Sequence, residues 1–239
     1  MNSNFLMELT RDEIKEKLDG GAIAILPIGA VEQHGNHLPL GTDNYLANII
    51  SNEVANQVNG VILPGVPFGY SWVWQDIPGT ITIQHHNLEL YLLDIFKSVE
   101  RSGFQKLVII NGHESNNTIL KYAVRDYSEM SNFRIFYFFY PKFEETWKEL
   151  CESDTWFGMM HACEFETSLM LATHPQLVKM ERAIREYPPY SAKYRNSSQQ
   201  LGELSKSGVF GDPTKADKDK GISLLDRFIR EIVKVINEE

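Results

Sequence analysis

The segment Gly29-Ala30-Val31-Glu32-Gln33-His34-Gly35-Asn36-His37-Leu38-Pro39-Leu40-Gly41-Thr42-Asp43 directly follows an apolar run. That run, Ala22–Ile28, is short and continuously apolar, which is typical of a strand buried on both faces of a parallel sheet. Imidazole and carboxylate groups gathered in a loop after such a strand are typical of hydrolytic metal sites. The segment therefore predicts a parallel α/β sheet with a metal site at its edge.

Short apolar runs and amphipathic segments alternate along the rest of the chain. Further strands are predicted over residues 61–63, 80–83, 107–110 and 133–139. Helices are predicted from a Thr10–Glu13 capping box to Gly20, from about Asn44, from an Asn87 N-cap to Gly103, over 119–127 and over 222–236. This alternation predicts one α/β domain over residues 1–239, built as three α/β/α layers around a mostly parallel central sheet.

Composition excludes several classes of partner. The 23 basic and 32 acidic residues give a net charge of −9, so the surface repels phosphate backbones and no nucleic-acid partner is expected. The two cysteines show no disulfide spacing, which indicates a reducing compartment. No signal-peptide pattern is found, and no apolar run approaches the roughly 20 residues that a bilayer span needs. We expect a cytoplasmic protein that does not bind membranes.

The Gly29–Asp43 segment carries groups suited to a pair of ions. Glu32 and His34 are two residues apart, so in an extended chain they point the same way. The carboxylate of Asp43 offers two oxygens that can bridge ions roughly 3.5–4 Å apart. The alternative is a polar loop whose groups, including His37, only hydrogen-bond one another. The number of such groups within a dozen residues favours the metal site over that alternative.

A second polar segment, Asn111-Gly112-His113-Glu114, follows the strand predicted over residues 107–110. In parallel sheets, ligands bind beyond the carboxyl ends of the strands, where this segment and the Gly29–Asp43 segment both lie. Taken alone, His113 also suits the entry to a helix. Beside the first segment it is predicted to be a further metal ligand.

A third segment, His161-Ala162-Cys163-Glu164-Phe165-Glu166-Thr167-Ser168, contains more of the same chemistry. On a helix, Glu164 and Glu166 lie about 200° apart, so we expect one to face inward and the other to be solvated. A helix that starts between His161 and Glu166 could bring both to the site. Cys163 could be a thiol nucleophile, but a buried structural cysteine is the commoner case.

Three other groups of residues are interpreted more simply. Trp72 and Trp74 either wall a substrate pocket or pack within their loop. His85 and His86, which precede the predicted Asn87 cap, are interpreted as structural. The charged stretch over residues 215–220 is interpreted as a solvated loop without a function.

These segments resemble the creatininase (creatinine amidohydrolase) family. Residues 27–43 are similar to its signature loop almost position by position, and Asn111-Gly112-His113 with Asn116 is similar to its second motif. The third motif is matched by His161-Ala162 and Glu166-Thr167-Ser168. Phe68-Gly69-Tyr70-Ser71, Pro78-Gly79-Thr80 and residues 208–213 also lie where the family has similar segments. The resemblance spans most of the chain.

The resemblance implies a three-layer α/β/α fold, a homo-oligomer (often a hexamer) and a binuclear site that holds zinc, manganese or iron. By position, Glu32 and His113 hold one ion, His34 and Glu166 hold the other, and Asp43 bridges them. His161 transfers a proton while a metal-bound hydroxide attacks a carbonyl carbon, as expected for a metal-dependent amidohydrolase.

The resemblance also bears on the substrate, which we expect to be a small polar molecule contacted by Ser71, Trp72 and Glu114. Creatininase itself has Tyr-Glu after its second-motif histidine, where this chain has Glu114-Ser115. It has Trp-Asp before the third-motif histidine, where this chain has Phe157-Gly158. These differences argue against creatinine and leave an amide or cyclic amide bond as the expected target. The alternatives are a C–C bond of an inosose-like cyclic polyol ketone, or a metal-binding protein without catalysis.

Overall fold

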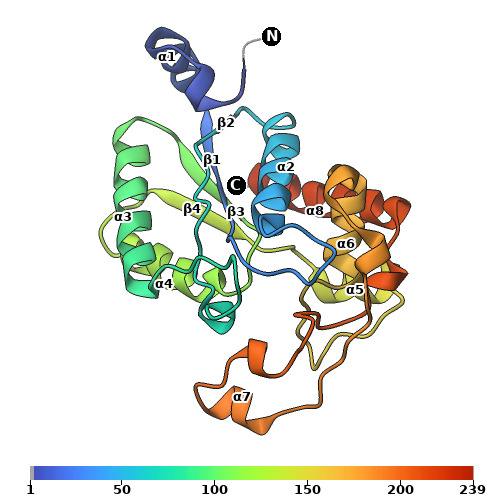
Figure 1. Cartoon of the computed structure of the whole chain (residues 1–239). Helices are drawn as coiled ribbons and strands as arrows, with labels where there is room; N and C mark the ends of the chain where they lie inside the picture. The colour runs from blue at the N-terminus through green and yellow to red at the C-terminus, as the bar shows by residue number, and fades with distance from the viewer. Residues whose placement is uncertain (1–2, 239) are drawn as a thin grey trace.

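In the computed structural model of the chain, which describes residues 3–238, the central sheet is parallel throughout (Figure 1). Its strand order is β2-β1-β3-β4, so β1 and β3 are the inner strands. The bounds of the strands are Ile23–Ile28 for β1, Gly60–Ile62 for β2, Lys106–Asn111 for β3 and Arg134–Phe138 for β4. Ile28 is paired with Asn111, so the polar segments that follow β1 and β3 start side by side.

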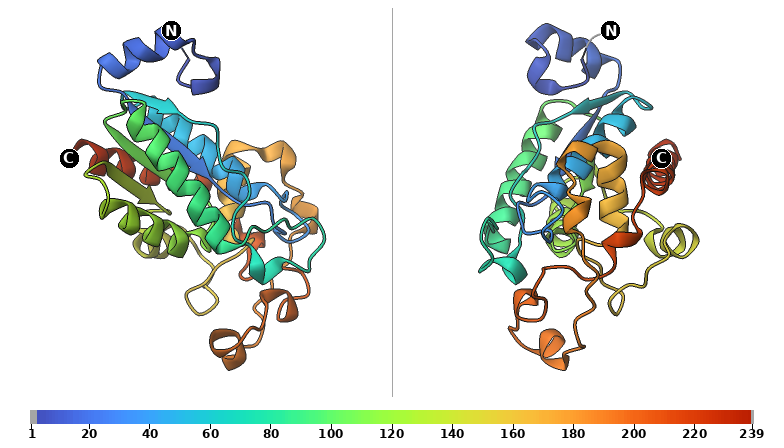
Figure 2. Two further views of the ribbon diagram at one scale, coloured as in Figure 1. Left: turned by 90° about the vertical axis from the view of Figure 1, so that its left-hand side faces the viewer. Right: turned by 45° about the vertical axis from the view of Figure 1, so that its right-hand side comes forward.

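Helices cover both faces of the sheet, which confirms the predicted three layers (Figures 1 and 2). One layer contains α3 (His85–Arg101) and α4 (Asn116–Ser128), and α1 (Arg11–Asp19) lies near the amino ends of the strands. The opposite layer contains α2 (Thr42–Ala55), α5 (Phe143–Leu150), α6 (Glu164–Thr173) and α8 (Lys218–Asn237). The short helix α7 (Ala192–Asn196) lies beyond the carboxyl ends of the strands.

Two apolar cores lie on the two faces of the sheet because side chains alternate along each strand. Ile23 and Ile25 of β1 belong to the core formed with α2, α6 and α8. Ala24 and Leu26 belong to the core formed with α3 and α4. Every residue of β1 is buried, which confirms that the Ala22–Ile28 run is a strand covered on both faces. Among the described residues, no helix combines the length and apolar composition of a bilayer span.

Two predicted elements differ in the structure. Residues 80–83 form no strand: Ile81 makes only a single antiparallel bridge with Val31, and half of its surface is exposed. The chain turns at Gly79, which has a left-handed φ of 90°, just before this bridge. The bridge is therefore not extended into a strand. Helix α3 begins at His85 with Gln84 as its N-cap, earlier than the predicted Asn87 cap.

The stretch over residues 215–220 is mostly exposed, as predicted, but its end is helical: Lys220 lies in the first turn of α8, and its ammonium contacts the carboxylate of Glu164. Glu164 is fully buried, and its carboxylate also accepts hydrogen bonds from the backbone N–H groups of Glu152 and Ser153. The prediction that Glu164 or Glu166 is solvated is therefore wrong. The two side chains do diverge, but α8 covers the face that Glu164 occupies.

We expect Glu164→Gln to lower the free energy of unfolding by about 3 kcal/mol at neutral pH, because it leaves the Lys220 ammonium without its buried partner. Burial raises the pKa of Glu164, but the hydrogen bonds from Lys220 and Ser153 outweigh it and hold the pKa below 4.5. The stabilisation is therefore present above pH 4.5 and lost as the pH falls through the lowered pKa. Denaturant unfolding should show the two proteins converging below pH 4.5.

The control is Glu149→Gln, which removes the carboxylate of a more exposed pair with Arg227. Exposed pairs are worth little, so its effect should stay within about 1 kcal/mol. Equal losses in the two variants would contradict the structural role given to Glu164.

Candidate metal centre

The segment after β1 returns to the sheet at the start of α2, where Asp43 is the second helical residue. Glycine permits this approach. A Cβ on Gly112 would lie 2.2 Å from the carbonyl oxygen of Asp43, and a Cβ on Gly29 would lie 2.6 Å from the side-chain oxygen of Asn44. Both positions must lack a side chain, so that the start of α2 can touch the ends of β1 and β3.

The carboxylate of Asp43 lies between two histidines. Its Oδ1 is 3.1 Å from Nε2 of His34, and its Oδ2 is 3.1 Å from Nδ1 of His113. The ring orientation of His34 is fixed by Nδ1, which donates to the backbone carbonyl of Glu32 at 3.2 Å, so Nε2 faces the carboxylate. All these side chains are buried. Asp43 therefore presents one oxygen to each histidine.

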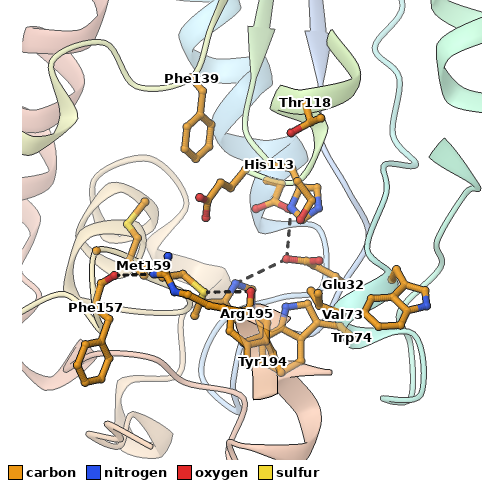
Figure 3. Close-up of a pocket in the computed structure, with 18 of the residues that line it drawn as sticks. Glu32, Val73, Trp74, His113, Thr118, Phe139, Phe157, Met159, Tyr194 and Arg195 are labelled. Atoms are coloured by element: carbon orange, nitrogen blue, oxygen red, sulfur yellow. Dashed lines mark hydrogen bonds and ion pairs between the residues drawn. The ribbon is translucent and has the colours of Figure 1, made fainter. Parts of the chain in front are cut away.

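Each histidine also has a second carboxylate nearby. Glu32 Oε1 lies 3.4 Å from Nδ1 of His113, as the dashed line in Figure 3 marks. Glu166 Oε1 lies 3.9 Å from Nε2 of His34. The other oxygen of Glu166 accepts the backbone N–H of Ala162 at 2.6 Å, and Ala162 holds a left-handed φ of 49°. This turn before α6 directs Glu166 into the site.

The structure thus brings together all five residues that the sequence analysis assigned as ligands. Candidate ligand atoms lie within 4.8 Å of one another in three groups, all buried: Glu32 with Asp43 and His113, His34 with Asp43 and Glu166, and Glu32 with His34 and His161. The first two groups share Asp43.

The hydrogen bonding of these residues tests whether they fit metal ions. Oε2 of Glu32, Nε2 of His34 and Oδ2 of Asp43 are buried and make no well-formed hydrogen bond, although the last two each lie 3.1 Å from an atom of opposite charge. Buried polar atoms without partners are uncommon and costly in folded proteins. Imidazole and carboxylate atoms of this kind, gathered in buried groups, are the donor chemistry that divalent transition metals take. The residues present fit such ions.

The charges of the site are strongly coupled. Burial opposes a charge on the imidazoles, but the neighbouring carboxylates, Asp43 above all, outweigh it and raise the pKa of His34 to about 10. Burial is likewise outweighed at His113, where Glu32 and Asp43 raise the pKa to about 9. Burial raises the pKa of Glu166 to about 7. The cluster of carboxylates therefore attracts positive charge, which protons or cations can supply.

His161 lies at the edge of this cluster, and its orientation is fixed on two sides. Its Nε2 donates to the backbone carbonyl of Gln33 at 2.7 Å, and its ring stacks on Trp74 with 4.8 Å between centroids. Its Nδ1 lies 3.6 Å from Oε1 of Glu32. Burial and the adjacent His34 lower the pKa of His161 well below its usual value. The neutral ring thus turns the lone pair of Nδ1 toward the site.

A cavity of about 750 Å³ opens in front of these side chains (Figure 3). Trp72 and Glu114, both expected to contact substrate, line it. Trp74 lines it too, so both tryptophans of this loop wall the cavity, and Trp74 also packs in a buried apolar cluster. Ser71 is fully buried and lies behind His113, with 3.4 Å between Oγ and Nε2. Contact between Ser71 and a substrate stays a prediction.

Several lining residues were not singled out from the sequence. Tyr194 and Arg195 of α7, with Met159, form one side of the cavity, and Thr118 and Phe139 lie across from them (Figure 3). None of them carries metal-binding chemistry, although Met159 and Thr118 each lie two residues from a motif residue, His161 and Asn116. Only their position next to the predicted motifs in the fold identifies them.

Two residues weighed as chemical candidates have other surroundings. His37 is buried, and its Nε2 lies 2.9 Å from the hydroxyl of Thr167, so it joins the first motif to the third without entering the ligand groups. Cys163 is fully buried, and burial raises the pKa of its thiol well above its usual value. Since the thiolate is the nucleophilic form, the structural interpretation of Cys163 is the better one.

The creatininase family, described as creatinine amidohydrolase, matches residues 7–236. Creatinine amidohydrolase of Pseudomonas putida is 28% identical, covering 99% of this chain and 97% of that protein. Mycofactocin precursor peptide peptidase of Mycobacterium ulcerans is 29% identical and covers 89% and 83%. The 3-dehydro-scyllo-inosose hydrolase of Thermotoga maritima is 26% identical and covers 77% and 60%.

Solved structures of the family have the same fold as this chain. A mutant creatininase of the zinc–zinc type superposes with a TM-score of 0.86 at 28% identity, covering 100% of this chain and 98% of that one. A manganese form of creatininase gives 0.83 at 27% identity, covering 99% and 98%. The chain therefore belongs to the creatininase family, with its three-layer fold, and is a metal-dependent amidohydrolase.

Proposed function

We propose that the chain binds two divalent ions and hydrolyses an amide or cyclic amide C–N bond of a small polar substrate. The observation that carries the proposal is the position of the Asp43 carboxylate between two histidines. One of its oxygens lies 3.1 Å from His34, and the other lies 3.1 Å from His113. Glu32 and His113 would hold one ion, His34 and Glu166 the other, and Asp43 would bridge them. Two ions sharing a carboxylate are the arrangement of binuclear hydrolases.

Zinc and manganese are the metals named for the solved relatives, and we propose the same kinds of ion here. Histidine and carboxylate ligands suit Zn, Mn and Fe alike, so the ligand set leaves the choice among them open. When bound, such ions lower the pKa of water and polarise a carbonyl oxygen.

His161 is proposed to carry the proton that the leaving nitrogen needs. Nδ1 is its free ring nitrogen, because Nε2 is held by the carbonyl of Gln33. Stacking on Trp74 keeps the ring in one plane, so Nδ1 stays directed at the carboxylates. A general acid or base positioned in this way contributes about 10²–10⁴ in rate.

Asp43→Ala should remove both ions, because each loses its shared ligand. We expect metal content measured by mass spectrometry to fall from about two equivalents per chain to near zero. The matched control is Glu114→Gln, which changes a carboxylate in the same cavity that is outside the ligand groups and should keep both ions. Two tightly held ions in Asp43→Ala would contradict the assignment.

His161→Gln should keep both ions and lower kcat by about 10²–10⁴, because the proton for the leaving nitrogen is no longer supplied. The loss should shrink for a p-nitroanilide compared with the alkylamide of the same acid, since that leaving group needs less protonation. Equal losses on both substrates would argue against proton transfer. Loss of an ion would instead make His161 a ligand, as its grouping with Glu32 and His34 allows.

The bond type is tested by product analysis of the metal-loaded protein on lactams, formamides, creatinine and inosose-like ketones. Hydrolysis of amides or lactams is the expected result, and activity on ketones alone would overturn the proposal. Hydrolysis of a C–C bond in a cyclic polyol ketone is the second candidate, which the similarity to the Thermotoga maritima hydrolase favours. The third possibility, a metal-binding protein without catalysis, is not supported, because the relatives that the chain resembles are named as hydrolases or peptidases.

Other expectations accompany this function as proposals. We propose a single domain over residues 1–239, since both apolar cores share the one sheet. The homo-oligomer, the small-molecule substrate and the cytoplasmic location stay predictions.

A further inference from the structure

The charged side chains that line the cavity are mostly acidic. The carboxylates of Glu32, Asp43, Glu114 and Glu166 line it, and among the described lining residues Arg195 is the sole arginine or lysine. When the ligand carboxylates bind ions, the positive charge of the ions neutralises their negative charge. The fixed positive side chain of the lining, Arg195, comes from α7, which contributes none of the candidate ligands.

The guanidinium of Arg195 has donors to spare. Its Nη2 donates to the backbone carbonyl of Phe157 at 3.1 Å, as Figure 3 shows. Within residues 3–238 it forms no salt bridge, although Glu114 is near enough for the two charges to interact. An arginine carries five N–H donors in a planar fork that matches carboxylate and phosphate groups. One contact to a carbonyl leaves most of that fork available to a ligand.

The cavity is also larger than the reacting bond requires. Its volume of about 750 Å³ lies in the range of about 300–1,000 Å³ that encloses a drug-sized ligand. A substrate with its amide at the ions therefore has room to extend toward the part of the cavity that α7 lines. Glu114 follows His113 directly and lies near enough to both His113 and Arg195 for the charges to interact, so its carboxylate disfavours an anionic group that is not paired with the arginine.

We propose that Arg195 determines specificity by binding an anionic group, a carboxylate or a phosphate, on the far end of the amide substrate. This inference rests on the proposed function and adds the substrate class: an acidic amide rather than a neutral one. The fork of Arg195 pairs with the anionic group while the amide lies at the ions. Phe157, whose carbonyl is held by the same guanidinium, lies beside the group that is bound.

The test uses pairs of probes that differ only in the anionic group. The carboxylate pairs are 5-oxoproline with its carboxamide and N-formylglycine with its carboxamide. The phosphate pair is the phosphate ester of N-formylethanolamine with N-formylethanolamine itself. Dissociation constants by calorimetry, and kcat/KM wherever a probe turns over, are measured on the metal-loaded wild type and its variants. The preferred pair distinguishes a carboxylate from a phosphate.

The wild type should favour the anionic member of at least one pair by about tenfold or more, the effect of one charge-assisted pair. Because anions also bind metal ions, the deciding measurement is the same ratio in Arg195→Gln, which should fall to within about twofold of one. Arg195→Lys, which keeps the positive charge but lacks the planar fork, should keep part of the wild-type preference for the anionic probe. Lys193→Gln, an exposed cation of the same helix that does not line the cavity, should keep the wild-type ratio.

The inference is overturned if no anionic member outbinds its neutral partner, or if Arg195→Gln keeps the preference. Failure of the proposed function has a different signature. In that case no amide is hydrolysed by the wild type, whatever its charge, while the binding ratios still report on Arg195. Hydrolysis of neutral and anionic amides at equal kcat/KM would be consistent with the proposed amide hydrolysis but would contradict the proposed preference for acidic amides.

Discussion

The contact between Gly112 and the backbone of Asp43 is the constraint on which the metal centre depends. It lets the first turn of α2 lie against the end of β3, one residue before His113. A helix N-terminus favours a negative charge, so the same turn supports the Asp43 carboxylate that it delivers. Any larger residue in place of Gly112 would push apart the two groups that an ion must join. The backbone packing thereby sets the distance between ligands that are far apart in sequence.

The charges of the site connect this packing to function. Buried charges are tolerated only when they are paired, and here the carboxylates of Glu32, Asp43 and Glu166 outnumber the imidazoles of His34 and His113. The carboxylates raise the pKa of both imidazole rings. Without ions, the protons that the rings then hold offset part of the excess negative charge. Divalent cations offset it more fully and release those protons. Metal binding should therefore also stabilise the fold.

The inner end of the site could be predicted from sequence because its determinants are local. Buried β1 and β3 are continuous apolar runs, and the polar groups that follow them must meet where parallel strands end. Features that depend on distant packing could not be predicted. Local sequence gives no sign that Glu164 is buried, because it is covered by α8 and paired with Lys220, which is distant in sequence. Residues 80–83 have strand-like composition, but no neighbouring strand lies beside them to form a sheet. Arg195 lies in a polar stretch without periodicity.

This division has a consequence for how substrate choice arises in the fold. The candidate ligands lie where α2 packs against the ends of the strands, whereas the outer wall of the cavity comes from irregular chain around Phe157 and from α7. Phe157 has a left-handed φ of 51°, a conformation that costs energy unless its surroundings hold it. Arg195 holds its carbonyl and lines the cavity at once, so a change at Arg195 alters both the charge and the shape of the wall. In the proposed function, the chemistry of the bond and the choice of substrate would thus depend on separate parts of the chain.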